Sequence, residues 1–567
     1  MAIRIKKDEG VSRVAEFEEN QQQHHHHTNQ THLHTPPGSM TQSRKPRKPN
    51  PQAREALQNH PSSSFSSSGM KLIVPLQGVV QGRGGLLLGT LVPCALFYFL
   101  QLYLKRRRSN FSPPSPSEPT LPRTSSRSSL STRGSISRVR VSKLATQISR
   151  PDESLYYVGL ERVSRDPYDA LENPNGIIQL GLSDNKLCLD LIGEWVARNL
   201  EGSISGGVGL GINGIVPYQT FDGVMELKMA LSDFMHQVIG GSVKFDPSNM
   251  VLTAGATPAI EILSFCLADH GNAFLVPTPY YPGFDRDVRW RPGVDLIPVH
   301  CRSTDNFDLN ITALEQAFSQ ARKRGVKVRG ILISNPSNPV GNMMTQDMLY
   351  SLLDFAEEKN IHIIADEVFA GSTYGSEKFV SIAEILNSDY IDKSRVHIIY
   401  GLSKDLSLAG FRVGVICSFN ESVLAAAKKL SRFSSISAPT QRLVTSMLSD
   451  KRFIREYFET NQKRIRQVHD EFVGCLSKLG IKCAKSSAGM YCWADMSGLI
   501  RPYSEKGEIE LWEKFLSVAK INITPGSACH CIEPGWFRIC FTTITLEEIP
   551  LVIERIRKVV ESCNSSS

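Results

Sequence analysis

The sequence lacks paired cysteine motifs. Its 12 cysteines include no C-x-x-C pair, and the densest group, Cys529, His530 and Cys531, does not have the spacing of a zinc knuckle. Four adjacent histidines at 24–27 have no carboxylate or thiol beside them and are typical of low-complexity sequence. We therefore predict no metal site and expect reduced thiols that face the cytosol.

Residues 151–567 also lack an excess of positive charge. They carry 42 basic and 49 acidic side chains, a net charge of −7, whereas residues 1–150 carry 22 and 7, a net charge of +15. A protein that mainly binds nucleic acid needs a positive face to displace phosphate counterions. We therefore exclude nucleic acid as its main partner and expect small-molecule chemistry.

One long stretch lacks charge altogether. Residues 84–104 are 21 uncharged, mostly apolar residues followed by four basic ones at 105–108, which matches the thickness of a bilayer. They predict a transmembrane helix, and the 11 basic residues in 105–150 place the large C-terminal part in the cytosol by the positive-inside rule. A buried or interfacial helix is the alternative, favoured by Pro93 and Gln101; without a membrane span, the protein would be cytoplasmic. A secretory signal is not expected, because the apolar segment begins too far into the chain.

The remaining N-terminal residues are polar and of biased composition. Residues 1–83 have too few apolar side chains to offset the entropy of folding and are predicted to be disordered. Residues 105–150 are rich in Ser, Pro and Arg and are predicted to form a solvated linker.

Beyond residue 151 the sequence predicts an α/β fold with a largely parallel sheet, because β-rich segments alternate with helical patterns. The predicted strands are Ala273–Val276, Gly330–Ile333, His362–Ala365, Val396–Tyr400 and Arg412–Cys417. Thr257 is expected to cap a helix that begins at Pro258, and Thr545 with Glu548 forms a capping-box pattern.

Chemically active residues follow two of these strands. Asp366 ends the first, and Lys404 comes four residues after the second, with Arg412 eight residues further on. Ligands of open α/β sheets bind at the carboxyl ends of the strands. Each residue alone is typical of a solvated surface; in this order they predict a site.

Five motifs carry a resemblance to a known family. They are residues 173–179 (NPNGIIQ), 278–287 (TPYYPGFDRD), 335–341 (NPSNPVG), 403–414 (SKDLSLAGFRVG) and 534–538 (PGWFR). The sequence resembles the fold-type I pyridoxal-phosphate aminotransferases over residues 155–562, and among them the plant 1-aminocyclopropane-1-carboxylate (ACC) synthases.

The resemblance implies pyridoxal 5′-phosphate as cofactor and assigns its contacts. Lys404 would bind it covalently and act as general base and acid; Asp366 would contact the pyridinium nitrogen. Tyr281 would stack on the ring and Asn338 would donate to its phenolic oxygen. The phosphate contacts are Arg412, Ser403 and the segment Gly255, Ala256 and Thr257 at a helix N-terminus.

The same resemblance implies a substrate site and a quaternary structure. Arg538 would bind the substrate α-carboxylate with its planar guanidinium. The family works as a homodimer. Its architecture implies an arm at 151–199, a large cofactor domain at 200–435 and a smaller C-terminal domain at 436–567.

Four positions depart from the synthase pattern. Asp184 stands where the synthases have glutamate, and Phe221 where they have a tyrosine that approaches the partner subunit's cofactor, with Tyr218 as its substitute. Phe369 replaces a tyrosine and Gly401 a serine, which removes two hydrogen-bond donors to the cofactor.

These substitutions affect substrate alignment and leave the proton-moving Lys404 in place. We therefore predict an aminotransferase that passes an amino group from an α-amino acid to a 2-oxo acid. Aspartate and aromatic amino acids are the expected donors, by likeness to a divergent branch of the synthase group. One alternative is a true ACC synthase acting on S-adenosylmethionine; another is a membrane-tethered, weakly active scaffold that pairs with active relatives.

Overall fold

The computed structural model describes residue 99 and residues 139–151, 153–204, 212–386 and 391–565. The chain divides into two units, residues 1–132 and 133–567, and all described residues except Phe99 belong to the second. The predicted disordered tail, the membrane helix at 84–104 apart from Phe99, and most of the linker therefore lie outside the described residues. Among the residues that are described, no helix is both long and apolar enough to cross a membrane.

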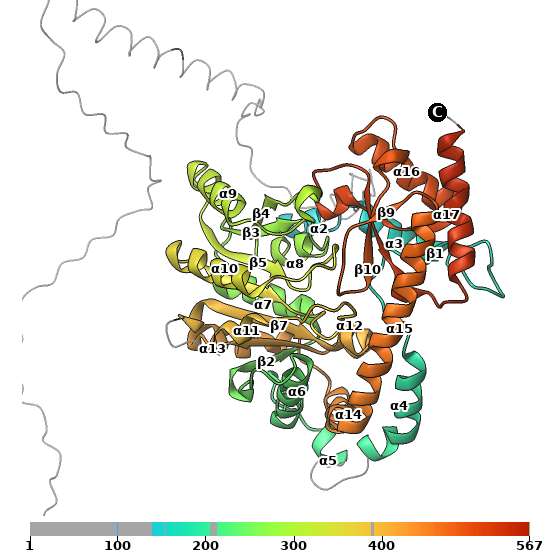
Figure 1. The fold of residues 1–567 in the computed structure, drawn as a ribbon. Helices are drawn as coiled ribbons and strands as arrows, with labels where there is room; N and C mark the ends of the chain where they lie inside the picture. Colours follow the sequence, from blue (N-terminus) through green and yellow to red (C-terminus); the bar gives the residue numbers. More distant parts are fainter. Residues whose placement is uncertain (1–98, 100–138, 152, 205–211, 387–390, 566–567) are drawn as a thin grey trace, which may run out of the picture. The chain divides into compact units, whose positions relative to one another are not determined.

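A seven-stranded sheet forms the centre of the second unit (Figure 1). Its strand order is β2-β8-β7-β6-β5-β3-β4, with β3 to β7 parallel and β8 antiparallel to both neighbours. The strands are β2 (Met250–Thr253), β3 (Ala273–Thr278), β4 (Asp295–His300), β5 (Val328–Ser334), β6 (His362–Asp366), β7 (Val396–Gly401) and β8 (Gly414–Ser418). The predicted α/β class and mainly parallel sheet are confirmed.

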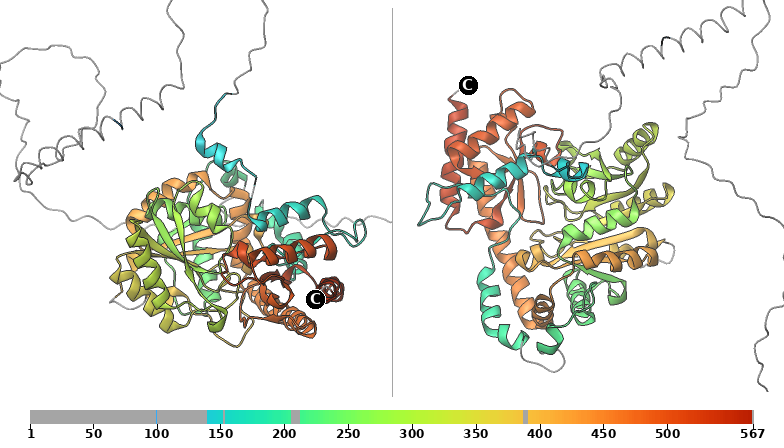
Figure 2. Two further views of the ribbon diagram at one scale, coloured as in Figure 1. Left: turned by 90° about the horizontal axis from the view of Figure 1, so that it is seen from above. Right: turned by 180° about the vertical axis from the view of Figure 1, so that it is seen from behind.

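Helices cover both faces of this sheet (Figure 2). One face packs on α7 (Ala256–Leu267), α8 (Phe284–Arg289) and α13 (Glu421–Leu430). The other packs on α6 (Met225–Val238), α9 (Ile311–Lys323) and α10 (Gln346–Glu358). Alternate residues of each strand enter the two layers; in β6, Ile363 faces one and Ile364 the other. Burial on both faces explains why these strands are continuous apolar runs.

A second, four-stranded sheet follows in the chain, in the order β12-β13-β10-β9. Its strands are β9 (Lys482–Cys483), β10 (Tyr491–Asp495), β12 (Thr524–Pro525) and β13 (Trp536–Cys540), and β1 (Ile178–Gln179) pairs separately with β11 (Ile521–Asn522). Three helices follow the first sheet or flank the second: α14 (Ala438–Ser449), the long α15 (Lys451–Lys478) and α16 (Glu505–Lys514).

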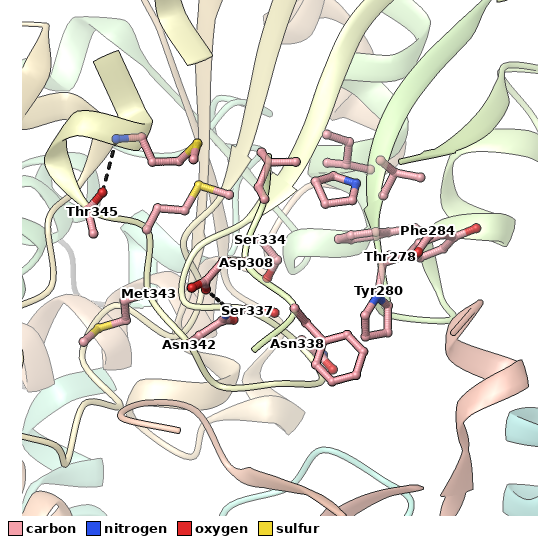
Figure 3. Close-up of a pocket in the computed structure, with 18 residues that line it drawn as sticks. Thr278, Tyr280, Phe284, Asp308, Ser334, Ser337, Asn338, Asn342, Met343 and Thr345 are labelled. Atoms are coloured by element: carbon pink, nitrogen blue, oxygen red, sulfur yellow. Dashed lines mark hydrogen bonds between the residues drawn. The ribbon is translucent and has the colours of Figure 1, made fainter. Parts of the chain in front are cut away.

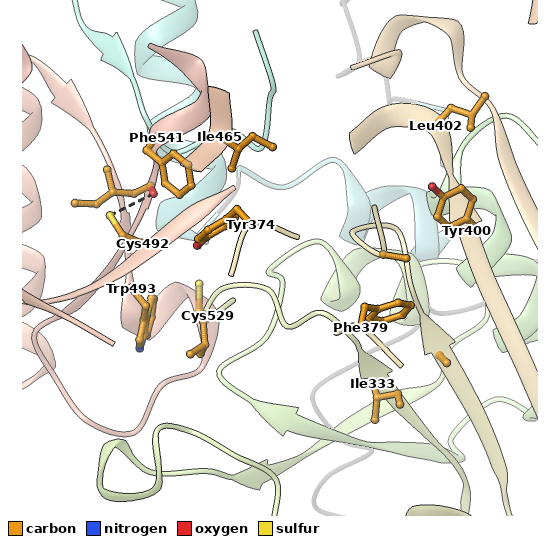
Figure 4. Close-up of a cluster of buried hydrophobic side chains, with 14 of the residues drawn as sticks. Ile333, Tyr374, Phe379, Tyr400, Leu402, Ile465, Cys492, Trp493, Cys529 and Phe541 are labelled. Carbon is orange, nitrogen blue, oxygen red and sulfur yellow. Dashed lines mark hydrogen bonds between the residues drawn. The ribbon is translucent and has the colours of Figure 1, made fainter. Parts of the chain in front are cut away.

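One apolar core joins the two sheets (Figure 4). Ile333 of β5 and Tyr400 of β7 belong to the same cluster as Trp493 of β10 and Phe541 after β13. This shared core fixes the C-terminal sheet against the carboxyl ends of the parallel strands, where the predicted site lies.

The N-terminal described residues include two short helices and two longer ones. These are α2 (Lys143–Ile148), α3 (Leu155–Arg165), α4 (Leu189–Ile204) and α5 (Ile212–Ile215). Helix α2 lies within the predicted linker and is exposed; the Ser142 hydroxyl caps it by accepting from the Ala145 amide. The remaining helices are α11 (Ile382–Ile385), α12 (Leu402–Asp405) and α17 (Ile549–Asn564).

One predicted helix start is wrong, and one predicted cap forms only in part. Helix α7 begins at Ala256 with Gly255 as its N-cap, two residues before the predicted start. Helix α17 begins at Ile549, and only half of the predicted capping box forms: the Thr545 amide donates to the Glu548 carboxylate, and the threonine side chain caps nothing.

Candidate active site

Lys404 lies at the start of α12, directly beyond the carboxyl end of β7. Its side chain is half-buried, and its Nζ donates to the Ser183 carbonyl oxygen at 2.8 Å. Burial lowers the pKa of Lys404 to about 8, with the Cys540 thiol opposing this shift and the Arg538 guanidinium adding to it. A substantial fraction of the amine is therefore neutral and nucleophilic near physiological pH.

Asp366 ends β6, the strand beside β7, as predicted. It is buried, and the hydrogen bond described for its carboxylate is a long one, 3.4 Å, from the Val368 amide. Burial raises its pKa to about 7, with that amide and Lys404 opposing the shift. A buried carboxylate so weakly compensated favours a cationic group above it.

The N-terminus of α7 meets Arg412 beside this pair. Gly255 has φ +99°, which favours glycine, and a Cβ on it would lie 2.3 Å from Arg412 Nη2 and would displace the guanidinium. Ala256 and Thr257 form the first turn of α7, and Ser403 precedes Lys404 in α12. Free helix amides and a guanidinium together make an anion-binding surface.

Arg538 lies in the middle of β13 and is fully buried. Its Nη1 donates to Asn338 Oδ1 at 2.9 Å and its Nη2 to the Gly181 carbonyl at 2.7 Å, while Nε has no partner among the described residues. The structure thus brings together two predicted residues from chain segments 200 positions apart. The free Nε is consistent with a further anionic ligand at this guanidinium.

Tyr281 comes from the loop between β3 and α8. A Cβ on Gly283 would lie 2.3 Å from the Tyr281 ring, so this glycine lets the ring lie against the backbone. The ring centroid is 6.2 Å from that of Tyr156. Tyr281 thus lies on the same side of the site as Arg538, which contacts Tyr156 as well, at 5.3 Å.

The segment Gly181–Asp184 forms the wall opposite the sheet. Besides the Gly181 and Ser183 bonds above, the Asp184 carbonyl accepts from Thr542 Oγ1 at 2.7 Å and from Cys540 Sγ at 3.5 Å. Asp184 lies close enough to Lys404 to influence its pKa. Hydrogen bonds to the main chain therefore hold the backbone of Asp184 in place, and with it the Cα atom that carries the side chain.

The structure does not bring Tyr218 to the site of its own chain. Its side chain is 96% exposed, and Phe221, 40% exposed, lies with its ring 5.4 Å from the Arg432 guanidinium. By contrast, Phe369 is buried, with its ring 5.9 Å from that of Tyr491, and Gly401 is the N-cap of α12.

Two residues that the sequence analysis missed also line the site. Tyr491 of β10 has its ring 4.6 Å from the Arg538 guanidinium, and its hydroxyl lies 3.5 Å from Asn338 Nδ2. Tyr156 of α3 is the second. Neither lies in one of the five motifs; the only signal was an aromatic residue in an apolar segment, which does not distinguish a site from a core.

A cavity of about 140 Å³ opens next to Asn338, at the carboxyl ends of β3 and β5 (Figure 3). It is lined by Thr278, Tyr280, Phe307 and Met344, among others. Lys404, Asp366, Arg412 and Arg538 do not line it, so the titrating groups identify the candidate site better than this cavity does. Within the described part of the chain, no group of three or more His, Cys, Asp or Glu side chains is placed to hold a metal ion.

Comparisons with known proteins agree with this geometry. The family model for aminotransferase class I and II matches residues 177–556. The chain belongs to this family. The enzymes are pyridoxal-phosphate-dependent, and the site fits the cofactor: it combines a half-buried lysine amine, a buried carboxylate with one long hydrogen bond and an anion-binding helix end.

Several plant members of this aminotransferase family are close in sequence. A protein of Arabidopsis thaliana named probable aminotransferase ACS12 is 61% identical, over 88% of this chain and 100% of its own. Rice 1-aminocyclopropane-1-carboxylate synthase 6 is 56% identical, over 88% and 94%. Apple 1-aminocyclopropane-1-carboxylate synthase is 45% identical, over 74% and 90%.

Solved structures of the family share the fold. A Thermus thermophilus aspartate aminotransferase matches with a TM-score of 0.60 and 20% identity, over 74% of this chain and 100% of its own. Most of the similar plant proteins bear the name ACC synthase. The names therefore favour the ACC synthase alternative over the predicted transamination.

Proposed function

We propose that the protein catalyses transamination between an α-amino acid and a 2-oxo acid, with Lys404 moving the α-proton. The observation that carries this proposal is the fixed position of Asp184. Its carbonyl is held by Thr542 and Cys540 on one side, and the preceding Ser183 carbonyl by Lys404 on the other. These bonds oppose a movement of the main chain that would make up for a side chain one methylene shorter than glutamate.

The residues divide the work as follows. The cofactor, when bound, supplies an electron sink for the carbanion left by the α-proton. Asp366 holds the proton on its ring nitrogen, Arg412 and the first turn of α7 hold its phosphate, and Tyr281 and Asn338 orient its ring. Arg538 binds the substrate α-carboxylate. Ser403 is a further contact of the cofactor phosphate, and Tyr218 replaces the synthase tyrosine that approaches the partner subunit's site.

Transamination needs only a base that takes the α-proton and returns it to a neighbouring carbon, which Lys404 can do alone. Closing the ACC ring needs, in addition, a substrate side chain aligned for displacement. The substitutions at 184 and 221 affect that alignment and spare Lys404. Aspartate and aromatic amino acids remain the expected donors.

ACC synthesis is the second candidate, and the names of the plant relatives favour it. Both reactions begin with the loss of the same α-proton, so the shared site does not separate them. Two assays on the full-length enzyme separate them: release of a 2-oxo acid from an amino acid, and formation of ACC from S-adenosylmethionine. Asp184→Glu is the informative variant, because it restores the synthase residue.

Oxo-acid release by the wild-type enzyme, with ACC formation appearing only in Asp184→Glu or not at all, supports the main proposal. ACC formation by the wild type without oxo-acid release overturns it in favour of the synthase. If the wild-type protein does not bind the cofactor at all, the result supports the alternative of a weakly active scaffold.

The assembly and the attachment of the chain extend this proposal. The exposure of Tyr218 and Phe221 supports a homodimer in which they approach the partner's site, with a large domain at 200–435 and a small one at 436–567. We also propose that residues 84–104 anchor the chain in a membrane. A variant lacking residues 1–108 should then remain in the supernatant on sedimentation, whereas the full chain pellets with membranes.

A further inference from the structure

The loop between β12 and β13 makes an unusual contact with the start of α8. His530, in this loop, has φ +60°, and its Nε2 lies 2.7 Å from Asp285 Oδ2. The other oxygen of the same carboxylate, Oδ1, accepts from the Tyr280 hydroxyl at 3.0 Å. The imidazole is stacked on the Tyr280 ring, with centroids 4.4 Å apart and planes 14° apart. We call Tyr280, Asp285 and His530 the clasp.

Backbone contacts reinforce the clasp. The Tyr280 amide donates to the Cys529 carbonyl at 2.9 Å, directly beside the stacked rings. The loop itself is held from behind by Glu508, whose carboxylate accepts from the amides of Ser527 at 2.8 Å and Gly535 at 2.7 Å. The His530 backbone is thus held in the left-handed region on both sides, although a non-glycine residue rarely adopts it.

The two ends of the clasp belong to different parts of the site. Tyr280 precedes Tyr281, which comes from the seven-stranded sheet, and His530 precedes by eight residues Arg538, which comes from the four-stranded sheet. The carboxylate of Asp285 therefore joins the segment that carries the ring-contacting tyrosine to the segment that carries the buried arginine. Apart from the shared apolar core, it is a direct polar link between them.

We propose that the clasp is a positioning device: His530, through Asp285 and Tyr280, sets the distance between Arg538 and Tyr281 and so determines the affinity for the substrate carboxylate. His530 touches neither substrate nor cofactor in this scheme. The proposal rests on the carboxylate-binding role proposed for Arg538. It also gives the Cys529-His530-Cys531 group, which does not have zinc spacing, a role without a metal.

Variants of His530 separate the two contributions to the clasp, which are the hydrogen bond to Asp285 and the stack on the Tyr280 ring. His530→Gln keeps a nitrogen that can donate to Asp285 and removes the aromatic stack, whereas His530→Phe keeps the stack and removes the hydrogen bond. Asp285→Ala removes the acceptor for both partners. His270→Ala, an exposed histidine in the loop after α7, is the matched control.

The experiment measures amide hydrogen exchange and steady-state kinetics on the full-length, cofactor-loaded enzyme. We expect His530→Ala to speed exchange in residues 527–531 about tenfold, to raise KM for the amino donor about tenfold, and to change kcat less than threefold. His530→Gln should recover part of the KM. Combining His530→Ala with Asp285→Ala should add little to either single change.

Unchanged exchange and unchanged KM in a folded His530→Ala overturn the proposal, as does an equal effect in His270→Ala. If His530→Ala does not fold, the Gln and Phe variants decide the question, and wild-type kinetics in both would overturn it. The exchange measurement needs no substrate. Wild-type enzyme that turns over no amino acid would therefore refute the proposed function and leave the clasp to be judged by exchange alone.

Discussion

At the scale of single residues, the account depends most on Lys404. Its pKa of about 8, lowered by burial, lies below the ordinary value of 10.5, so the charged form persists below pH 8 and the neutral amine dominates above it. Only the neutral amine attacks an aldehyde. We therefore predict that cofactor-free enzyme captures pyridoxal phosphate faster as pH rises from 6.5, with the rate levelling off above about 8.5. The rate is measured by absorbance. A rate that keeps rising to pH 10 would contradict the lowered pKa of Lys404.

The pKa of Asp366 is shifted in the opposite direction, and it gives a second prediction. Its pKa of about 7 in the folded chain exceeds the ordinary 3.8, so folding favours the protonated carboxyl, and this stabilisation is lost as pH rises through 7. Asn cannot ionise. The melting temperature of cofactor-free Asp366→Asn, relative to wild type, should therefore increase by a few degrees between pH 5 and 8.

The exposed carboxyl of Asp354 in α10 provides the control, since Asp354→Asn should show no such trend. A flat difference for Asp366→Asn would mean that the carboxylate is not destabilised by burial. In the cofactor-loaded enzyme, the wild type should have the higher melting temperature, because Asp366→Asn should bind the cofactor more weakly.

Phe369 and Gly401 can each be given back the hydrogen-bond donor that the synthases have. A Cβ on Gly401 would lie 3.3 Å from the Val413 carbonyl, a close but adjustable contact. A hydrogen bond to a charged group contributes about 1.5 kcal/mol, or about tenfold in affinity. Phe369→Tyr and Gly401→Ser should each slow the release of pyridoxal phosphate by roughly this factor. Faster release from both variants, measured by dialysis and absorbance, would show that these positions do not face the cofactor.

At the scale of elements, the N-terminus of α7 is the most sensitive point of the phosphate site. Gly255→Ala places a Cβ against Arg412 and forces alanine to φ +99°. Gly271→Ala is the matched control, because its φ is +82° and nothing lies within 4 Å of the added carbon. Both variants should lose about 1 kcal/mol of stability from backbone strain. Only Gly255→Ala should also weaken cofactor binding, by at least tenfold in a fluorescence titration; equal affinities would contradict the contact.

The sequence predicted five strands of the seven-stranded sheet but missed β2, although its four residues are all buried. The buried strands β5, β6 and β7 are apolar on both faces, so their runs stand out and their ends locate Asp366 and Lys404. Strand β4 was missed because, as a half-exposed edge strand, it carries the exposed residues Asp295, Pro298 and His300. Strands β9 and β12 have two residues each, too few for any periodicity.

The candidate site could be predicted where a motif or the end of a strand marked it. Lys404 and Arg538 stand in motifs and Asp366 ends a predicted strand, and the structure brings them together. Tyr491 and the Ser183 carbonyl could not be found, because their proximity to Lys404 and Arg538 depends on how the four-stranded sheet packs on the parallel one. The start of α7 was misplaced because Thr257 is a good capping residue, whereas close approach to Arg412 selects Gly255 as the cap.

At the scale of the whole molecule, the proposed reaction depends on where the α-proton goes after it is removed: its return to a carbon atom gives transamination, and ring closure gives ACC. The residues proposed to hold the cofactor and the carboxylate come from both sheets, and the proposed clasp joins them. The differences from the synthases at 184, 369 and 401 lie near these residues, Phe221 lies outside the site of its own chain, and all four leave Lys404 unchanged. The choice between the two reactions is therefore the decisive property of the molecule.

The most direct test mixes the full-length, pyridoxal-phosphate-loaded enzyme with L-aspartate, and separately with L-phenylalanine, without any oxo acid. The account predicts that the absorbance changes to that of pyridoxamine phosphate and that one 2-oxo acid is released per site, with Lys404→Ala showing neither. An unchanged cofactor with both amino acids, together with ACC formation from S-adenosylmethionine, would contradict it.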